Sequence, residues 1–240
     1  MTKPSGYILY EGASLLDGKP IVAIALTGSS NRKTGGMVQI LYIRTDIDPI
    51  SANKSGEDYS ICGTCRLRGK PHDRDDRATA DERGCYVMLL GILGVYKAYK
   101  AGKYPRISMA NYNALVDGRT VRLGMYGDPA CVPAYLNKRW IANAKAHTAY
   151  SHQANTVGAD YDPSVCMRSA DTLEEAREAW AKGERTFRVG DLTSKVEGKE
   201  IECPSNKGVK CEDCVLCSGM KINAKSILIP AHGTGKKWVA

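Results

Sequence analysis

The sequence is poor in phenylalanine: Phe187 is the only one among 240 residues, whereas 13 tyrosines are present. Aromatic side chains with a polar tip therefore take its place. No stretch approaches the roughly 18 apolar residues of a membrane span. The first residues, MTKPSGYILYEG, lack the apolar core of a signal peptide. These absences predict a protein of the cytoplasm with no membrane partner.

Cysteine, by contrast, is abundant. The chain has nine, an odd number, and six of them stand in or close to Cys-x2-Cys spacings. In a reducing compartment, clustered cysteines serve metal binding or catalysis more often than disulfides. A chain of this length can bury a sizeable core, so it does not need metals merely to fold.

The most informative cysteines lie near the C-terminus: Cys203, followed by Pro204, and then Cys211, Cys214 and Cys217. A loop with a sulfur at every third residue, together with a remote Cys-Pro, is typical of a [4Fe–4S] cluster. Zinc sites usually combine two separate Cys-x2-Cys knuckles, so zinc is the alternative cofactor. Redox-active or merely crowded thiols are a third possibility.

A second group consists of Cys62, Cys65 and Cys85. Three thiolates are one ligand short of a closed metal site, so this group is a possible second site or an unused set of structural thiols. The sequence offers four residues as the missing ligand: His72, Asp73, Cys131 and Cys166. Enzymes that cleave S-adenosylmethionine by radical chemistry carry Cys-x3-Cys-x2-Cys, which is absent here, so that chemistry is not expected.

The pattern of apolar residues predicts a single α/β domain over residues 1–240. Its parts are a β-rich segment 1–84, βα units in 85–203, and a cysteine-rich cluster-binding loop with the C-terminal segment in 203–240. The expected strands are 6–12, 20–27, 37–44, 120–126, 147–152, 164–169, 185–189 and 199–203, with a strand running into a helix over 85–101. Helices are expected over 131–146 and 172–183, the latter capped by Thr172 and closed by Gly183. The Gly- and Ser-rich segment 28–36 is expected to be a flexible surface loop.

Strands that alternate with helices favour parallel βα units. We expect a partial or irregular β/α (TIM-like) barrel, with a doubly wound sheet as the alternative. Polar residues follow each expected strand, and in a barrel such strand ends meet on one face. The residues in these positions are 126–128, 151–153, Ser169, Asp171, Arg188 and Cys203.

A catalytic site at this face would use His152 as the base, Asp128 as the orienting group and Ser151 as the nucleophile. Asp171 could replace Asp128, and Ser169 or Ser205 could replace Ser151. The sequence lacks the Gly-x-Ser-x-Gly nucleophile elbow. The prediction is therefore an iron–sulfur enzyme, with esterase-like hydrolysis of a small substrate as its candidate reaction. The alternative for His152 is a structural hydrogen-bonding role, which is the more common role of a lone histidine.

The charge of +8 permits a nucleic-acid partner, and the densest basic segment is Arg66 to Arg77. A metal-stabilised nucleic-acid-binding protein is therefore an alternative function. A cluster that cycles reversibly would instead indicate electron transfer or redox sensing.

Several motifs recur together in this order: SGYILYEG, SNRKTG, ICGTC, GCYV, VRLGMYGDPACVP, YSHQ, RTFRV, ECPS with its following cysteines, and ILIPAHG. Through these motifs the chain resembles, over nearly its whole length, a family of uncharacterised proteins of bacteriophages and bacterial mobile elements. The resemblance implies a phage-borne protein of the bacterial cytoplasm with an iron–sulfur site on Cys203, Cys211, Cys214 and Cys217. Cys131 and Cys166 depart from the family pattern.

Overall fold

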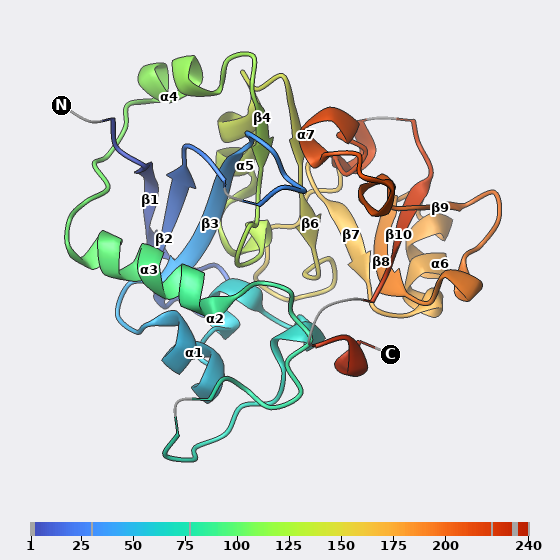
Figure 1. The fold of residues 1–240 in the computed structure, drawn as a ribbon, viewed down its shortest axis with the longest axis horizontal. Coiled ribbons are helices and arrows are strands. Elements are labelled where there is room, and N and C mark those ends of the chain that lie inside the picture. The colour runs from blue at the N-terminus through green and yellow to red at the C-terminus, as the bar shows by residue number, and fades with distance from the viewer. Residues whose placement is uncertain (1–2, 30, 77, 222, 232–234, 240) are drawn as a thin grey trace.

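The computed structural model describes residues 3–29, 31–76, 78–221, 223–231 and 235–239, and they form a mixed α/β fold (Figure 1). Within them, the first sheet has five strands in the order β1-β2-β3-β4-β5. They are β1 (Gly6–Ala13), β2 (Pro20–Leu26), β3 (Val38–Arg44), β4 (Thr120–Arg122) and β5 (Ala146–Thr148). The pairs β1-β2 and β2-β3 are antiparallel, whereas β3-β4 and β4-β5 are parallel.

The second sheet in the described residues has the order β6-β7-β8-β10-β9, and all its pairs are parallel. Its strands are β6 (Tyr150–Ser151), β7 (Met167–Ala170), β8 (Thr186–Gly190), β9 (Glu200–Glu202) and β10 (Ser226–Pro230). Only Ala149 separates β5 from β6; its carbonyl accepts a hydrogen bond from Met167 N–H, and its own N–H donates to the carbonyl of Cys217. One continuous segment therefore gives an edge strand to each sheet.

Helices α1 and α2 pack beside β3, and α6 packs on β7 and β8 (Figure 1). The α-helices are α1 (Pro49–Ser55), α2 (Tyr59–Cys62), α3 (Leu89–Lys100), α4 (Met109–Val116), α5 (Ala134–Ile141), α6 (Leu173–Ala181) and α7 (Cys211–Cys214). Short 3-10 helices are η1 (Arg66–Arg68), η2 (Pro129–Cys131), η3 (Leu192–Ser194), η4 (Pro204–Lys207), η5 (Gly219–Lys221) and η6 (Lys236–Trp238).

The main core lies against β2 and β3, in which nearly every residue is buried. Tyrosines fill part of it, and two of their buried hydroxyls find acceptors. Tyr42 Oη donates to Asn137 Oδ1 at 2.8 Å, and Tyr112 Oη donates to the carbonyl of Trp140 at 3.1 Å. A smaller core in the second sheet contains Cys203 and Cys217. Tyrosines such as Tyr42 and Tyr112, whose hydroxyls are satisfied, thus take the place of phenylalanine in the core.

Most predicted strands are confirmed, but several elements differ from the expectation. The predicted strand at 120–126 ends at Arg122, because Gly124 takes a positive φ of 70° that extended backbone does not allow. Residues 85–88 form no strand, and α3 begins only at Leu89. The sequence analysis did not identify β10, nor helices α1, α2, α4 and α7.

The segment 28–36, expected to be a flexible surface loop, packs against α7 in its described part. Lys33 carbonyl accepts a hydrogen bond from Cys211 N–H at 2.7 Å, and Gly36 N–H donates to Glu212 Oε2 at 2.6 Å. This loop is therefore tied to the C-terminal cysteines.

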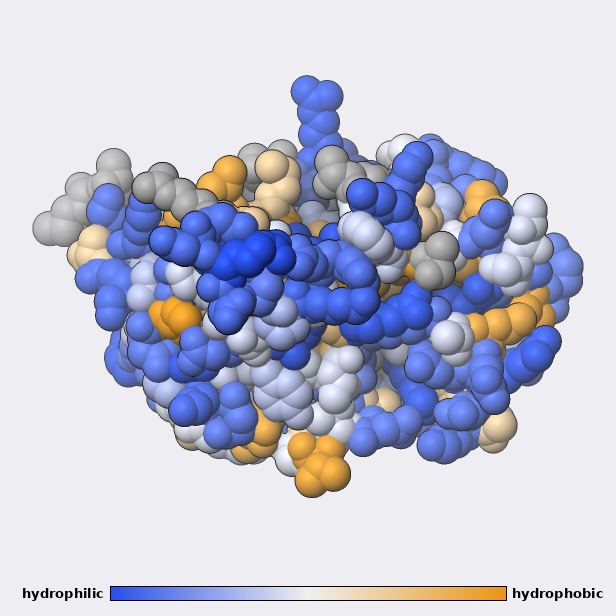
Figure 2. All heavy atoms as spheres, turned by 90° about the horizontal axis from the view of Figure 1, so that it is seen from below, coloured by the Kyte–Doolittle hydropathy of each residue, from blue (hydrophilic) through white to orange (hydrophobic). Residues whose placement is uncertain are grey.

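The face in Figure 2 is mostly hydrophilic, with small apolar patches scattered over it. In the part of the chain that the structure describes, every helix is too short to cross a membrane.

Candidate functional site

A cavity of about 300 Å³ lies between the two groups of cysteines. Its walls come from the loop 31–34, the segment after β4, the ends of the parallel strands of the second sheet, and both cysteine groups. Seven of the predicted strand-end residues line it: Tyr126, Gly127, Asp128, His152, Ser169, Asp171 and Cys203. Arg188 does not, because it pairs with the buried Glu200 at 2.8 Å. Residues far apart in sequence therefore meet at one site.

The four C-terminal cysteines surround a second, smaller cavity of about 20 Å³. Cys203 directly follows β9, and its N–H donates to the carbonyl of Leu228 in β10. One turn of α7 separates Cys211 from Cys214, and Cys217 follows on the same loop. Cys203 and Cys211 line both cavities. Two of the four cysteines thus form part of the wall of the large cavity.

The thiols of this tetrad influence one another. Burial and the neighbouring Cys203, Cys211 and Cys214 raise the pKa of Cys217 to about 12, although a hydrogen bond from Tyr150 lowers it. Ser205 Oγ lies 3.1 Å from the sulfur of Cys203. Without a bound cation, the buried thiol of Cys217 therefore keeps its proton.

Arg185 holds the loop that carries the tetrad. Its guanidinium donates to the carbonyls of Leu216, Gly219, Ala224 and Lys225 at 2.7–2.8 Å. The side chain is buried, and among the described residues it has no carboxylate partner. Burial lowers its pKa, and the charge of Cys217 opposes that effect. A buried cation without an anion is costly, so this site favours negative charge on the neighbouring sulfurs.

The N-terminal group, Cys62, Cys65 and Cys85, lines the other end of the large cavity. Cys62 ends α2, and Cys65 N–H donates back to its carbonyl at 3.2 Å. Gln153 fixes the turn between them, because its Nε2 donates to the carbonyl of Cys62 at 2.9 Å. Its Oε1 accepts from Thr64 N–H at 3.2 Å.

His152, next to this glutamine, lies beside the same cysteines. Its Nε2 is 3.3 Å from Asp171 Oδ1. Burial lowers the pKa of His152, but the charge of Cys65 and the hydrogen bonds to Asp171 and Cys65 outweigh it and raise the pKa well above its ordinary value. The structure therefore adds an imidazole and a carboxylate to the three thiols.

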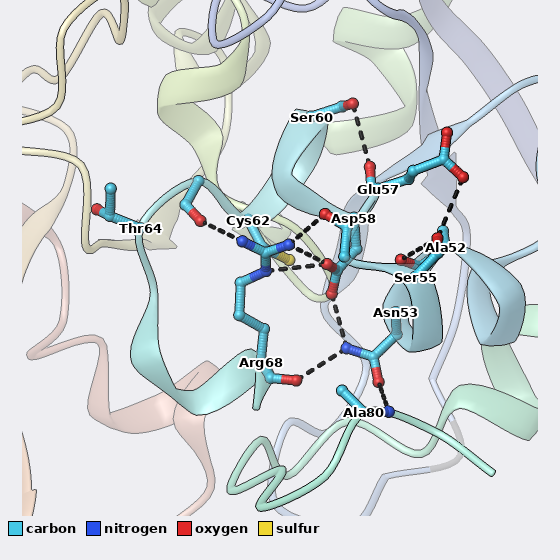
Figure 3. Close-up of polar contacts among 12 residues, drawn as sticks. Ala52, Asn53, Ser55, Glu57, Asp58, Ser60, Cys62, Thr64, Arg68 and Ala80 are labelled. Carbon is cyan, nitrogen blue, oxygen red and sulfur yellow. Dashed lines mark hydrogen bonds and ion pairs between the residues drawn. The ribbon is translucent and has the colours of Figure 1, made fainter. Parts of the chain in front are cut away.

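A buried network supports the turn that carries Cys62 and Cys65 (Figure 3). Arg68 Nε donates to Asp58 Oδ1, and Arg68 Nη1 donates to the carbonyl of Gly63, both at 2.9 Å. Asn53 Nδ2 donates to Asp58 Oδ2 at 2.7 Å. The turn is thus held from α1, α2 and η1 together.

None of the four ligands predicted to complete the N-terminal group lines the large cavity with it. Cys131 and Cys166 are buried in the apolar core. His72 Nε2 contacts the carbonyl of Thr79 at 3.0 Å, and Asp73 is exposed. Sequence reasoning missed His152 as a neighbour of these thiols, although its place after an expected strand was noted. His232, the fourth histidine of the sequence, lies outside the described residues.

The residues predicted as catalytic lie together, but they do not form a relay. Asp128 Oδ1 accepts from Ala130 N–H and its Oδ2 from His152 N–H, at 3.0 and 2.8 Å. The ring of His152 faces Asp171 instead. Ser151 is fully buried, and its Oγ accepts from Gln153 N–H. In this geometry the carboxylate of Asp128 therefore holds the backbone of Ala130 and His152 in place.

Metal ligation is not preformed: among the described residues, no three His, Cys, Asp or Glu side chains are already placed to hold a metal ion. In its described residues, 66–76, the basic segment is largely neutralised by carboxylates. Its pairs are Arg66–Asp171 at 3.7 Å, Arg68–Asp58, Lys70–Glu82 at 2.6 Å and Arg74–Asp81 at 2.7 Å. Residues 66–76, the described part of this segment, therefore offer no continuous cationic stripe for phosphates.

Comparison with known protein families, with curated proteins and with solved structures finds no match, so the function has to be argued from the site itself.

Proposed function

We propose that Cys203, Cys211, Cys214 and Cys217 hold a [4Fe–4S] cluster and that the large cavity beside it is the substrate site of an enzyme. The observation that carries this proposal is that all four cysteines line one small cavity. Cluster ligation by four thiolates gives a net negative charge, and the buried Arg185 beside Cys217 supplies a matching cation.

The residues fit such a cluster in chemistry. The small cavity is otherwise lined mainly by apolar side chains, among them Val209, Val215 and Leu216. Ser205 offers a hydroxyl near a sulfur, the kind of contact that tunes a cluster. A cavity of about 20 Å³ has room for about one water. The loop 204–217 would therefore move outward when a cuboidal cluster binds.

The proposed enzyme would place its substrate between the two cysteine groups. Cys203 and Cys211 line the large cavity, so a bound molecule would lie next to the cluster. We interpret the parallel strands of both sheets, joined through Ala149, as a partial β/α barrel with this cavity at its mouth. The resemblance to phage proteins would place the chain in a bacterial cytoplasm.

A second metal site at Cys62, Cys65 and Cys85 is part of the proposal, with His152 as its fourth ligand. Three cysteines and one histidine are a usual zinc set. A ligating histidine commonly gives its other ring nitrogen to a carboxylate, and Asp171 lies at that distance from Nε2. His152 is therefore better supported as a ligand than as a catalytic base.

Hydrolysis remains a prediction with less support. Ser151 is buried, and the ring of His152 faces Asp171 rather than Ser151 or Asp128. Ser169 and Ser205 do line the cavity, so a hydrolytic reaction would have to use one of them.

Anaerobic purification with iron, sulfide and zinc analysis tests the proposal. About four iron and four sulfide per chain, with one additional zinc, is the expected result. A cluster that cycles reversibly with dithionite and oxygen would favour electron transfer or redox sensing over an enzyme. A colourless protein without sulfide contradicts the cluster.

A further inference from the structure

The large cavity contains two polar side chains that lack a partner. Tyr126 is 4 % exposed, and its hydroxyl is buried with no hydrogen-bond partner among the described residues. The buried Nε of Arg122 also has none, and no carboxylate of the described chain pairs with this guanidinium. Both side chains line the cavity. Because unsatisfied buried donors are costly and uncommon, these two mark a place for ligand oxygens.

Most other walls of the cavity are apolar. Met125, Val189 and Ile229 line it together with Tyr150 and Phe187, whose ring centroids are 4.4 Å apart. A cavity of about 300 Å³ with apolar walls and a few polar groups suits a small organic ligand. The apolar body of the ligand would lie on these side chains.

Both unpartnered groups act as donors. A guanidinium stays charged and prefers carboxylate or phosphate. Burial and the nearby Cys62 raise the pKa of Tyr126 well above its ordinary value, so the phenol keeps its proton. Since Arg122 also lies within electrostatic range of Cys211, an acid group bound to it would sit at the tetrad end of the cavity.

We propose that the cavity binds an organic anion, a carboxylate or phosphate on an apolar body, with its acid group on Arg122 and a second oxygen on Tyr126. This inference rests on the proposed function in taking the cavity as the substrate site. Binding itself does not require the cluster, so the two can fail separately.

The test is calorimetric titration of the purified protein with three probes that share a hydroxynaphthalene body and differ in one substituent. They are 6-hydroxy-2-naphthoate, 6-hydroxy-2-naphthyl phosphate and the neutral 6-hydroxy-2-naphthamide. We expect at least one anion to bind about tenfold or more tightly than the amide, the effect of one charged hydrogen bond. Comparing the two anions tells which acid the site takes.

Two variants and one control assign the binding to these residues. Arg122→Gln should abolish the preference for the anion. Tyr126→Phe should weaken the binding of the anion and of the amide alike, because both probes carry the second oxygen as their 6-hydroxyl group. Arg139→Gln, an exposed arginine of α5 outside the cavity, should leave all affinities unchanged.

The inference is overturned if no probe binds, if the amide binds as tightly as the anions, or if Arg122→Gln keeps the preference. Iron content is measured in the same samples. Anion preference in a protein without iron would refute the cluster and support this inference. A protein with a full cluster and no anion preference would support the cluster and refute this inference.

Discussion

The buried pair of Arg68 and Asp58 provides the sharpest test of how the N-terminal cysteine turn is held. Asp58 is 1 % exposed. Arg68 donates to this carboxylate and to the carbonyls of Gly56 and Gly63. Replacing Arg68 with Met keeps most of the apolar stem but leaves Asp58 as an uncompensated buried charge. Breaking a buried pair in this way costs about 3–5 kcal/mol.

The loss should depend on pH in a defined direction. Burial already raises the pKa of Asp58, although Arg68 and Asn53 lower it. Without Arg68 this pKa rises further above that of the unfolded chain. A folded state that binds more protons than the unfolded state gains stability as pH falls, so going from about pH 7 to about pH 5 should restore part of the loss.

Urea unfolding of wild type and Arg68→Met, in the same metal state, measures the effect. Asp58→Asn added to Arg68→Met should recover stability, because it removes the orphaned charge. Arg74→Met is the matched control, because the pair of Arg74 and Asp81 is about half exposed. The free energy of unfolding of this variant should stay close to that of wild type. A loss for Arg68→Met no greater than that of Arg74→Met, or one independent of pH, would refute this reasoning.

Three further predictions concern the core, a helix cap and the cysteine turn. Trp140→Ala empties a site that is 1 % exposed and should cost about 3–5 kcal/mol in urea unfolding, whereas the exposed Trp238 should tolerate the same change. Thr172→Ala removes the side-chain oxygen that accepts from Glu175 N–H and should cost about 1 kcal/mol by the same assay. Gly63→Ala should lower the zinc content of the N-terminal site, because Gly63 has a φ of 52° and an added Cβ would collide with Gln153 Oε1; unchanged zinc would show that the turn tolerates the strain.

The features that the sequence predicted correctly are those that depend on neighbouring residues. Helix α6 is one case, because Thr172 accepts from Glu175 N–H as an N-cap should. Glu175 in turn accepts from the N–H of Asp171, one residue before the cap. The strands β1, β2 and β3 are another. The four C-terminal cysteines, singled out by their spacing, line one small cavity, and their role as cluster ligands stays a prediction.

The features that the sequence did not predict depend on the tertiary fold. Strand β10 is a short apolar run that cannot be told from a buried loop or helix by its pattern, and it inserts between β8 and β9. The approach of His152 and Asp171 to Cys65 results from the ends of β6 and β7 meeting the turn after α2. The contact of the loop 28–36 with α7 joins segments far apart in the chain.

The most direct test of the central claim is the iron and sulfide content of single alanine variants of Cys203, Cys211, Cys214 and Cys217, each purified anaerobically beside Cys131→Ala. Cys131 is fully buried in the apolar core, so its variant controls for the loss of a buried thiol. We predict about four iron and four sulfide per chain in wild type and in Cys131→Ala, and a loss of both in each of the tetrad variants. Tetrad variants that keep the wild-type iron, or a wild type that holds only zinc, would contradict the account.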